Sequence, residues 1–199
     1  MTALVAFSAL PQENLTHNEG LHFLEAGRRL ERGMNLATLL RSTLVNVIPT
    51  SEESLVVEAV LGVTDSLTTY RRRYQAGTRV GAVLDLVVQD EANPRSLAYQ
   101  IVELAALVED MPHDPLGPIR TAAQKGVLRL LTELRLAELD RLAQPDDTPG
   151  QRRGALEEFL LDQESGMAAV SDALTAQYFR HEEHPHHMIE HRVSGPIRG

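Results

Sequence analysis

The sequence of 199 residues contains no cysteine, which excludes a disulfide framework, a thiolate metal site and a cysteine nucleophile. Lysine is nearly absent as well, because Lys125 is the single lysine among 19 basic residues. No apolar run reaches the roughly 20 residues that a membrane-spanning helix needs. The first residues lack the basic region and long apolar stretch of a signal peptide. These absences predict a soluble, cytoplasmic protein.

The net charge of the chain is −9. An acidic total argues against non-specific nucleic-acid binding, which depends on neutralising phosphates. The excess of arginine over lysine has two explanations. It can reflect genome composition, or it can serve local pockets in which planar guanidinium groups bind carboxylate or phosphate in bidentate fashion.

Composition and periodicity predict helices throughout. Leu, Ala, Arg and Glu dominate and favour helix, and no alternating strand pattern is present. A capping box at Thr16-His17-Asn18-Glu19 predicts the start of a long helix that Pro49 ends. Its expected apolar face comprises Phe23, Gly27, Leu30, Met34, Ala37, Leu44 and Val47.

A second capping box, Thr50-Ser51-Glu52-Glu53, predicts another helix that continues to a stop at Gly77. Its expected apolar face comprises Val56, Val60, Val63, Leu67, Tyr70 and Tyr74. Residues 79–88 are apolar on several sides and predict a short buried helix, with a strand as the weaker alternative. Asn93-Pro94 has the residue types of an N-cap and a first helical position, and the helix they start is expected to end near Asp110.

The remainder of the chain predicts two more helices. A proline-rich loop covers residues 111–118, a helix follows over 119–143, and the last helix spans roughly 151–180 after a second proline-containing linker. We therefore predict an all-α fold, a bundle of about five to six helices. Residues 1–180 form one expected domain, followed by a polar, His-rich flexible tail at 181–199.

Several motifs resemble a known family when taken in order. They are Glu13-Asn14-Leu15-Thr16, His22-Phe23-Leu24, Gly27-Arg28-Arg29-Leu30-Glu31-Arg32, Thr69-Tyr70-Arg71-Arg72-Arg73-Tyr74, Val83-Leu84-Asp85-Leu86 and Asn93-Pro94-Arg95-Ser96-Leu97-Ala98-Tyr99-Gln100. Together they resemble the bacterial alpha-E domain, a helical module of unknown function named for its Glu-Arg motif. The resemblance covers residues 10–105, and it is closest to the second half of such a domain, so the chain is expected to be a fragment, a short form or part of a fusion.

The resemblance implies a biological setting more than a mechanism. Domains of this kind are similar to those fused to, or encoded beside, circularly permuted ATP-grasp ligases, with transglutaminase-like proteins nearby. This setting implies an accessory role in making or processing a peptide or amide-linked product. An ATP-grasp ligase and a transglutaminase-like protein are the expected partners, and no cofactor is expected. The apolar segment 1–10 needs cover, which a partner or a second copy of the chain would provide.

The arginine-rich motifs supply the candidate binding residues. Glu25, Arg28 and Arg32 share one polar helix face, which is either a solvated surface with weak ion pairs or a clamp for an anion. Glu31 lies at the flank of the apolar face and Arg41 falls inside it, so a buried ion pair is expected for each. A carboxylate or phosphate pocket would draw on several helices. The candidate binding residues are Arg28, Glu31, Arg32, Arg71, Arg72 and Arg95.

The C-terminal histidines raise the alternative of a metal site. The run from His187 to His191 fits H-x-x-E-H, in which two histidines one helical turn apart bind zinc. Pro185 interrupts the preceding helix and no third ligand is placed by a scaffold, so adventitious binding at His184, His187 and His191 is the most that we expect. No P-loop, nucleotide-binding glycine motif or nucleophile elbow is present.

Three functions from different classes are therefore compatible with the sequence. The favoured one is a non-catalytic helical interaction module for an ATP-grasp ligase system. The second is a small-anion or peptide-binding domain that uses the arginine and tyrosine surface. The third is a metal-dependent enzyme that uses the C-terminal histidines.

Overall fold

The computed structural model of the chain describes residues 19–74, 77, 79–113, 116–147 and 151–179. Within these ranges the protein is built from helices, and the one β interaction is an isolated bridge between Asn46 and Arg152. The predicted all-α class is confirmed. Thr16, the N-cap of the predicted N-terminal capping box, lies outside the described residues, as do the apolar segment 1–10 and the C-terminal histidines.

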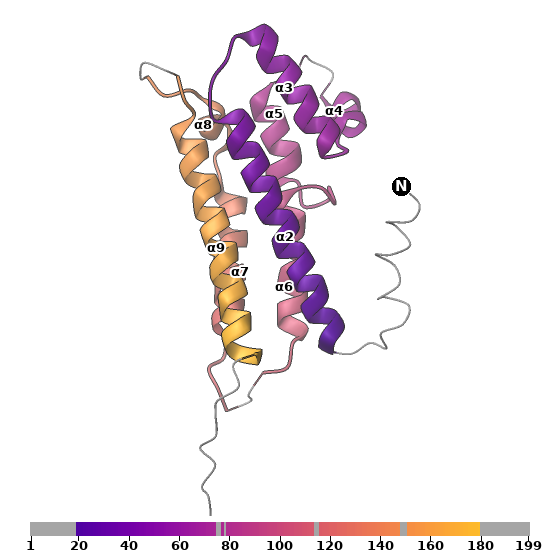
Figure 1. Ribbon diagram of the computed structural model, residues 1–199, viewed down its shortest axis with the longest axis vertical. Helices are drawn as coiled ribbons and strands as arrows, with labels where there is room; N and C mark the ends of the chain where they lie inside the picture. The colour runs from indigo at the N-terminus through magenta and orange to yellow at the C-terminus, as the bar shows by residue number, and fades with distance from the viewer. Residues whose placement is uncertain (1–18, 75–76, 78, 114–115, 148–150, 180–199) are drawn as a thin grey trace, which may run out of the picture.

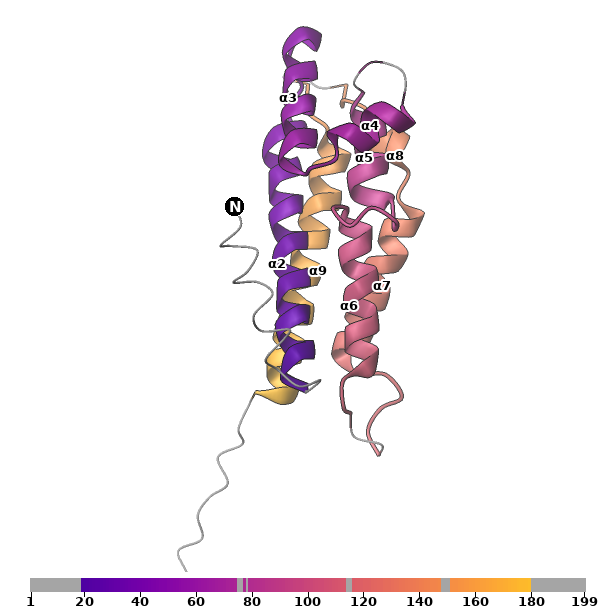
Figure 2. The same ribbon diagram turned by 90° about the vertical axis from the view of Figure 1, so that its right-hand side faces the viewer.

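Four long helices form the body of the protein. Of these, α2 and α7 each pack against both α6 and α9, and successive long helices run in opposite directions (Figure 1). The view turned by 90° shows α2 with α9 as one layer and α6 with α7 as the other (Figure 2). The remaining helices gather at one end of this bundle (Figure 1 and Figure 2). The bounds are α2 (Glu19–Leu44), α3 (Thr50–Val63), α4 (Leu67–Arg73), α5 (Val80–Leu84), a π-helical turn η1 (Asp85–Gln89), α6 (Leu97–Asp110), α7 (Ala122–Leu136), α8 (Leu139–Ala143) and α9 (Gly154–Tyr178).

The buried face of α2 differs from the predicted apolar face, because several of its residues are shifted by one position along the chain. Its buried residues are Ala26, Leu30, Gly33, Leu36, Ala37, Leu40 and Leu44. Gly27 was expected in the core and is exposed. The helix presents Gly33 to α9 instead, where an added Cβ would lie 2.6 Å from Met167 Sδ. With this rotation Glu31 points into solvent, so its predicted burial is wrong.

The second predicted helix is interrupted. It divides into α3 and α4 at residues 64–66, where Asp65 has a φ of 48°. The expected core residue Val63 is 73% exposed as a result. The predicted capping box at Thr50 is also wrong, because Thr50 is already helical and Pro49 occupies the N-cap position without a side-chain cap.

The predicted buried helix at 79–88 is confirmed and includes an unusual turn. Residues 80–84 are α-helical, and the amide of Asp90 donates to the carbonyl oxygen of Asp85, five residues earlier. Wider turns of this kind add one residue to a helix. The turn directs Gln89 to the end of α7, where its side-chain amide donates to the carbonyls of Leu134 at 2.9 Å and Ala137 at 3.2 Å.

Two further helix boundaries differ from the prediction. The N-cap of α6 is Ser96, whose Oγ accepts the amide of Tyr99 at 3.0 Å, so Asn93-Pro94 precedes the helix. The predicted helix 119–143 divides into α7 and α8. These interruptions explain why the described residues contain eight α-helical segments in place of the five or six expected.

Candidate functional site

Two of the arginine-containing motifs, those at residues 27–32 and 93–100, meet beside a pocket between α2, the end of α3 and the start of α6. Its cavity volume is about 490 Å³. The α2 side contributes positions i, i+3, i+4 and i+7 of one helix face. The lining residues are Arg32, Asn35, Leu36, Leu39, Val63, Thr64, Asp65, Pro94, Arg95 and Gln100. We call this cavity the α2–α6 pocket.

The interruption between α3 and α4 places a carboxylate at the pocket. Asp65 adopts a left-handed backbone conformation, which Asp and Asn tolerate better than most residues. The hydroxyl of Thr64 donates to the carbonyl of Val60 at 2.9 Å, and the amide of Ser66 donates to the carbonyl of Leu61 at 2.8 Å. These bonds satisfy carbonyls at the end of α3. The side chain of Asp65 accepts a hydrogen bond from Arg95 Nη2 at 3.1 Å.

The segment that carries Arg95 is held by a dense hydrogen-bond network. The Asn93 side chain accepts the amide of Arg95 at 3.1 Å and donates to the carbonyl of Leu86 at 2.8 Å. The Gln100 amide donates to the carbonyl of Pro94 at 2.7 Å. Ser96, which is fully buried, donates to a backbone carbonyl at residue 90. The polar residues of this motif therefore fix the loop and present Arg95.

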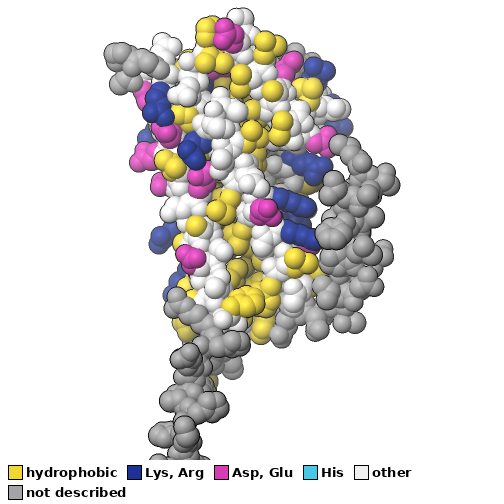
Figure 3. All heavy atoms as spheres, in the orientation of Figure 1, with side chains coloured by type: hydrophobic (Ala, Val, Ile, Leu, Met, Phe, Trp, Pro, Cys, Tyr) yellow, Lys and Arg dark blue, Asp and Glu magenta, His cyan; other side chains and the backbone are white. Residues whose placement is uncertain are grey.

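Three arginines of α2 have three different environments. Arg28 pairs with Glu25 at 2.6 Å, as the predicted i, i+3 spacing requires. Arg29 lies between α2 and α6, with its guanidinium 5.6 Å from the centre of the Tyr99 ring and 3.3 Å from Gln100 Oε1. Arg32 is exposed, and no described residue forms a hydrogen bond or ion pair with it. Figure 3 shows basic side chains gathered beside α2 on this face of the molecule.

The structure brings two of the six candidate binding residues to the same cavity, Arg32 and Arg95. Arg71 pairs with Glu58 at 3.5 Å on the surface, and Arg72 is exposed. Both belong to the last turn of α4, where positive charge meets the negative end of the helix dipole. Neither Arg28 nor Glu31 lines the pocket. Arg41 forms an ion pair with Glu164 at 3.5 Å, with side chains 35% and 18% exposed, so the ion pair expected for Arg41 is present but only partly buried.

The family assignment follows from comparison with known proteins. The Alpha-E family, described as a predicted alpha-helical domain with a conserved ER motif, matches residues 1–179. The chain belongs to the Alpha-E family. The match extends well beyond the resemblance at residues 10–105, and Glu31-Arg32 is the single Glu-Arg dipeptide in this Alpha-E sequence. Its two members both face solvent, and Arg32 borders the α2–α6 pocket.

Relatives of this Alpha-E chain are much longer proteins. An uncharacterized protein of Mycobacterium bovis and one of Mycobacterium tuberculosis are each 32% identical to it over 176 residues. The aligned region is 88% of this chain and 19% of each relative. The chain therefore spans about a fifth of the length of the curated relatives that it matches. No solved structure matches the chain.

A second cavity in the Alpha-E bundle is built around a tyrosine–aspartate pair. It has a volume of about 700 Å³ and lies between α5, η1 and α8. The Tyr74 hydroxyl donates to Asp85, and the Tyr74 ring contacts the guanidinium of Arg73. Burial, followed by the hydrogen bond and charge of Asp85, raises the pKa of Tyr74 above its ordinary range. A hydrogen bond to Asp90 at 2.5 Å raises the pKa of Arg73. Tyr70 is fully buried, as predicted.

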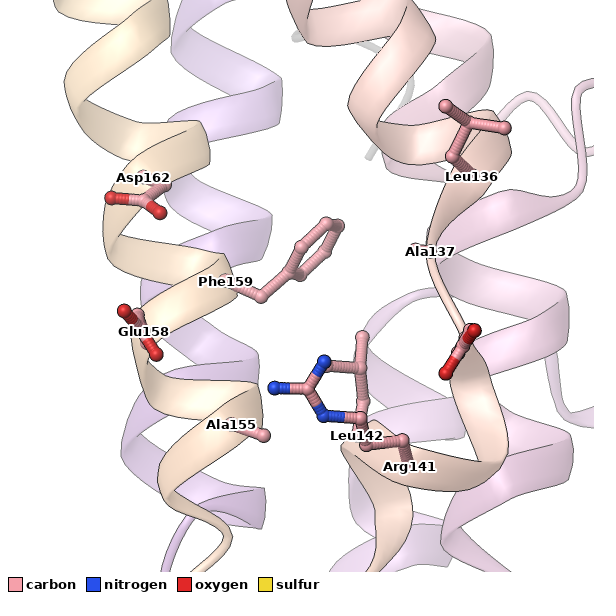
Figure 4. A pocket seen from close by; sticks show the side chains of 9 residues that line it. Leu136, Ala137, Arg141, Leu142, Ala155, Glu158, Phe159 and Asp162 are labelled. Atoms are coloured by element: carbon pink, nitrogen blue, oxygen red, sulfur yellow. The ribbon is translucent and has the colours of Figure 1, made fainter.

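A third cavity, of about 330 Å³, separates α8 from α9. Arg141 from α8 and Phe159 from α9 extend into it from opposite sides (Figure 4). Three carboxylates, Glu138, Glu158 and Asp162, line the same space, so their negative charge outweighs that of the single arginine. This cavity offers less to an anionic ligand than the α2–α6 pocket.

The described residues show neither a metal centre nor a membrane span. In the ranges that the structure covers, no three His, Asp or Glu side chains are grouped so as to hold a metal ion. Every helix in these ranges is too short or too polar to cross a lipid bilayer. The histidines His184, His187 and His191 lie outside the described residues.

The most buried arginine was not among the candidates. The Arg153 side chain is 5% exposed and donates to the carbonyls of Leu44 and Ala143, both at 2.9 Å, and to Glu53 at 2.7 Å. The two carbonyls belong to the last residues of α2 and α8, where helices leave acceptors unsatisfied. Arg153 is adjacent to Arg152 at the start of the predicted last helix, and no sequence pattern distinguishes the two.

Proposed function

We propose that this Alpha-E domain is a non-catalytic helical accessory module of a circularly permuted ATP-grasp ligase and transglutaminase-like system in peptide or amide-bond metabolism. The observation that carries the proposal is the length of the relatives. In proteins about five times as long, the matched region is one part of a larger chain. A helical domain in that position would act on, or together with, other domains.

The charged surface of α2 and the adjoining loop supports an interaction role. Arg28 pairs with Glu25 of its own helix, and Arg29 and Arg95 pair with carboxylates on neighbouring elements. Arg32 remains available for an external partner. An acidic protein with a local basic site can select partners by charge, because potentials at an interface guide association and orientation. We propose the α2 surface as the contact site for the ligase.

Calorimetric titration of the purified chain against the neighbouring ATP-grasp ligase, with and without ATP, tests this function. We expect saturable binding that Arg32→Glu weakens and that Arg129→Glu leaves unchanged. Arg129 is a suitable control because it is exposed and unpaired within the described residues, and it belongs to α7, diagonally opposite α2. A folded chain that neither binds the ligase nor alters its activity would contradict the proposal.

A second function is favoured by the α2–α6 pocket itself. We propose that it binds a small anion or a peptide, because two guanidinium groups from separate elements line one cavity. Planar guanidinium groups hold carboxylate and phosphate oxygens in bidentate fashion. Binding of a carboxylate or of phosphate that is lost in an Arg32→Gln and Arg95→Gln double variant, with helicity preserved, would support this function.

A further inference from the structure

The α2–α6 pocket combines three kinds of surface that one ligand can satisfy. We propose that it binds the free carboxyl terminus of a peptide whose last residue has an apolar side chain. This inference rests on the second function proposed above and names its ligand class. In this proposal the carboxylate of the ligand binds Arg32 and Arg95, and its last peptide group bonds to Asn35. The apolar side chain of its last residue packs against α2 and the end of α3.

The charge of the pocket selects an anion. The charged residues of its lining are two arginines, Arg32 and Arg95, and one carboxylate, Asp65. The lining therefore has a net positive charge, in a protein whose total charge is −9. The cavity at Tyr74 and the cavity at Phe159 each contain more carboxylates than arginines. The Arg95–Asp65 pair is a surface pair, with side chains 54% and 82% exposed, and such pairs contribute little to stability. Arg95 can therefore turn toward a bound carboxylate at small cost.

Asn35 supplies the group that distinguishes a peptide from a simple anion. It lies three residues after Arg32 on the same face of α2, and no described residue forms a hydrogen bond with its side-chain amide. A side-chain amide offers both a donor and an acceptor, which matches the acceptor and the donor of a peptide group. The other amide of the lining, on Gln100, already bonds to Pro94 and Arg29.

The apolar part of the pocket explains the preference for an apolar last residue. Leu36 and Leu39 form its α2 wall, with Val63 and Pro94 opposite. Val63 is 73% exposed although it ends a helix whose other valines are largely covered. A ligand side chain placed here would remove exposed apolar surface from water. The volume of about 490 Å³ falls in the range of small-ligand pockets.

Titration of the full chain with N-acetyl-L-leucine tests the assignment, using three matched probes. N-acetyl-L-leucinamide lacks the carboxylate, N-acetylglycine lacks the apolar side chain, and inorganic phosphate lacks the peptide group. We expect saturable binding of N-acetyl-L-leucine and at least about tenfold weaker binding of the leucinamide, the size of effect that a lost charge-assisted hydrogen bond produces. We expect weaker binding of N-acetylglycine and of phosphate as well.

Variants locate the binding. Arg32→Gln and Asn35→Ala should each weaken N-acetyl-L-leucine binding about tenfold, and Arg129→Gln should leave it unchanged. Phosphate binding that equals or exceeds leucine-derivative binding, and that depends on Arg32, would overturn the peptide assignment while leaving an anion site. If none of the four probes binds the unaltered, folded chain, both the peptide assignment and the anion site are wrong. The proposed ligase interaction does not depend on this result, because the titration against the ligase tests it separately.

Discussion

At the scale of single residues, burial decides which of the many arginines stabilise the protein. Arg153 is almost completely buried and bonds to three acceptors on three elements. Arg152, which precedes α9, is 52% exposed and pairs with Glu157 of α9. Exposed pairs contribute about 0–1 kcal/mol. Removal of one partner from a buried pair leaves the other partner without compensation and is much more costly.

Replacing Arg153 by Met should therefore lower the free energy of unfolding by about 3 kcal/mol or more. The matched variant Arg152→Met should change it by less than about 1 kcal/mol. Urea denaturation followed by circular dichroism measures both. Equal losses in the two variants would show that Arg153 does not join α2, α3 and α8 as its hydrogen bonds indicate.

Tyr74 gives a prediction about pH. Its pKa is raised in the folded protein, so the unfolded chain loses the phenolic proton first as pH increases. The stabilising contribution is fully present below the ordinary tyrosine pKa of about 10 and is lost as pH rises from there toward the folded pKa. We expect the urea concentration at the denaturation midpoint to decrease when the pH is raised from about 9 to about 11. The decrease should be smaller in Tyr74→Phe, which has no phenolic proton at this position.

Phenolate absorbance provides a direct check on Tyr74. The difference between the titrations of the unaltered chain and Tyr74→Phe should show one tyrosine that ionises above the ordinary range. A difference component that titrates near pH 10, the ordinary value for tyrosine, would contradict the hydrogen bond between Tyr74 and Asp85.

At the scale of helices, glycine positions set how closely the bundle packs. An added Cβ at Gly126 would lie 2.7 Å from Val170 Cγ2, and one at Gly166 would lie 2.5 Å from Leu130 Cδ2. Both neighbours are buried, and a valine in a helix has little rotational freedom with which to yield. The contact between α7 and α9 thus depends on small residues on each helix.

Gly126→Ala should be neutral to destabilising by about 2 kcal/mol. Overpacking costs about 1–3 kcal/mol, and the higher helix propensity of alanine offsets about 1 kcal/mol of that. Gly27→Ala is the matched control, because nothing lies within 4 Å of its added Cβ; it should stabilise the protein by up to about 1 kcal/mol. Thermal denaturation measures the midpoints of both variants, which are compared with the midpoint of the unaltered chain.

The steric explanation also predicts that Gly126→Ala is no longer destabilising when Val170 is alanine. The double variant Gly126→Ala, Val170→Ala should then have a thermal midpoint no lower than that of Val170→Ala alone. If Gly126→Ala stabilised the protein as much as Gly27→Ala does, the close approach of α7 and α9 would be wrong.

At the scale of the whole molecule, the four long helices close into one ring of contacts. Each long helix packs against two others, and the buried residues form one continuous core that includes Leu40, Leu104, Leu130 and Leu160. A single core predicts a single cooperative unfolding transition. The far-ultraviolet signal of the helices and the near-ultraviolet signal of the tyrosines should change at the same denaturant concentration.

Leu104→Ala provides the variant for this prediction. Leu104 is fully buried in α6, and truncation of a buried leucine costs about 2–5 kcal/mol. Both optical transitions should shift together to lower denaturant. Separate shifts would show that the end of the bundle formed by α3, α4 and α8 unfolds on its own.

The sequence by itself determined the helical class, the approximate extents of α2, α6 and α9, and the buried helix at 80–89, because local propensity and apolar periodicity depend on neighbouring residues alone. It also supplied the motifs of the Alpha-E family and two residues of the pocket. Tertiary structure decided the rest. The division between α3 and α4 and the rotation of α2 depend on which faces pack together. The meeting of Arg32 with Arg95, and the burial of Arg153, depend on elements far apart in the chain, and no local pattern records such contacts.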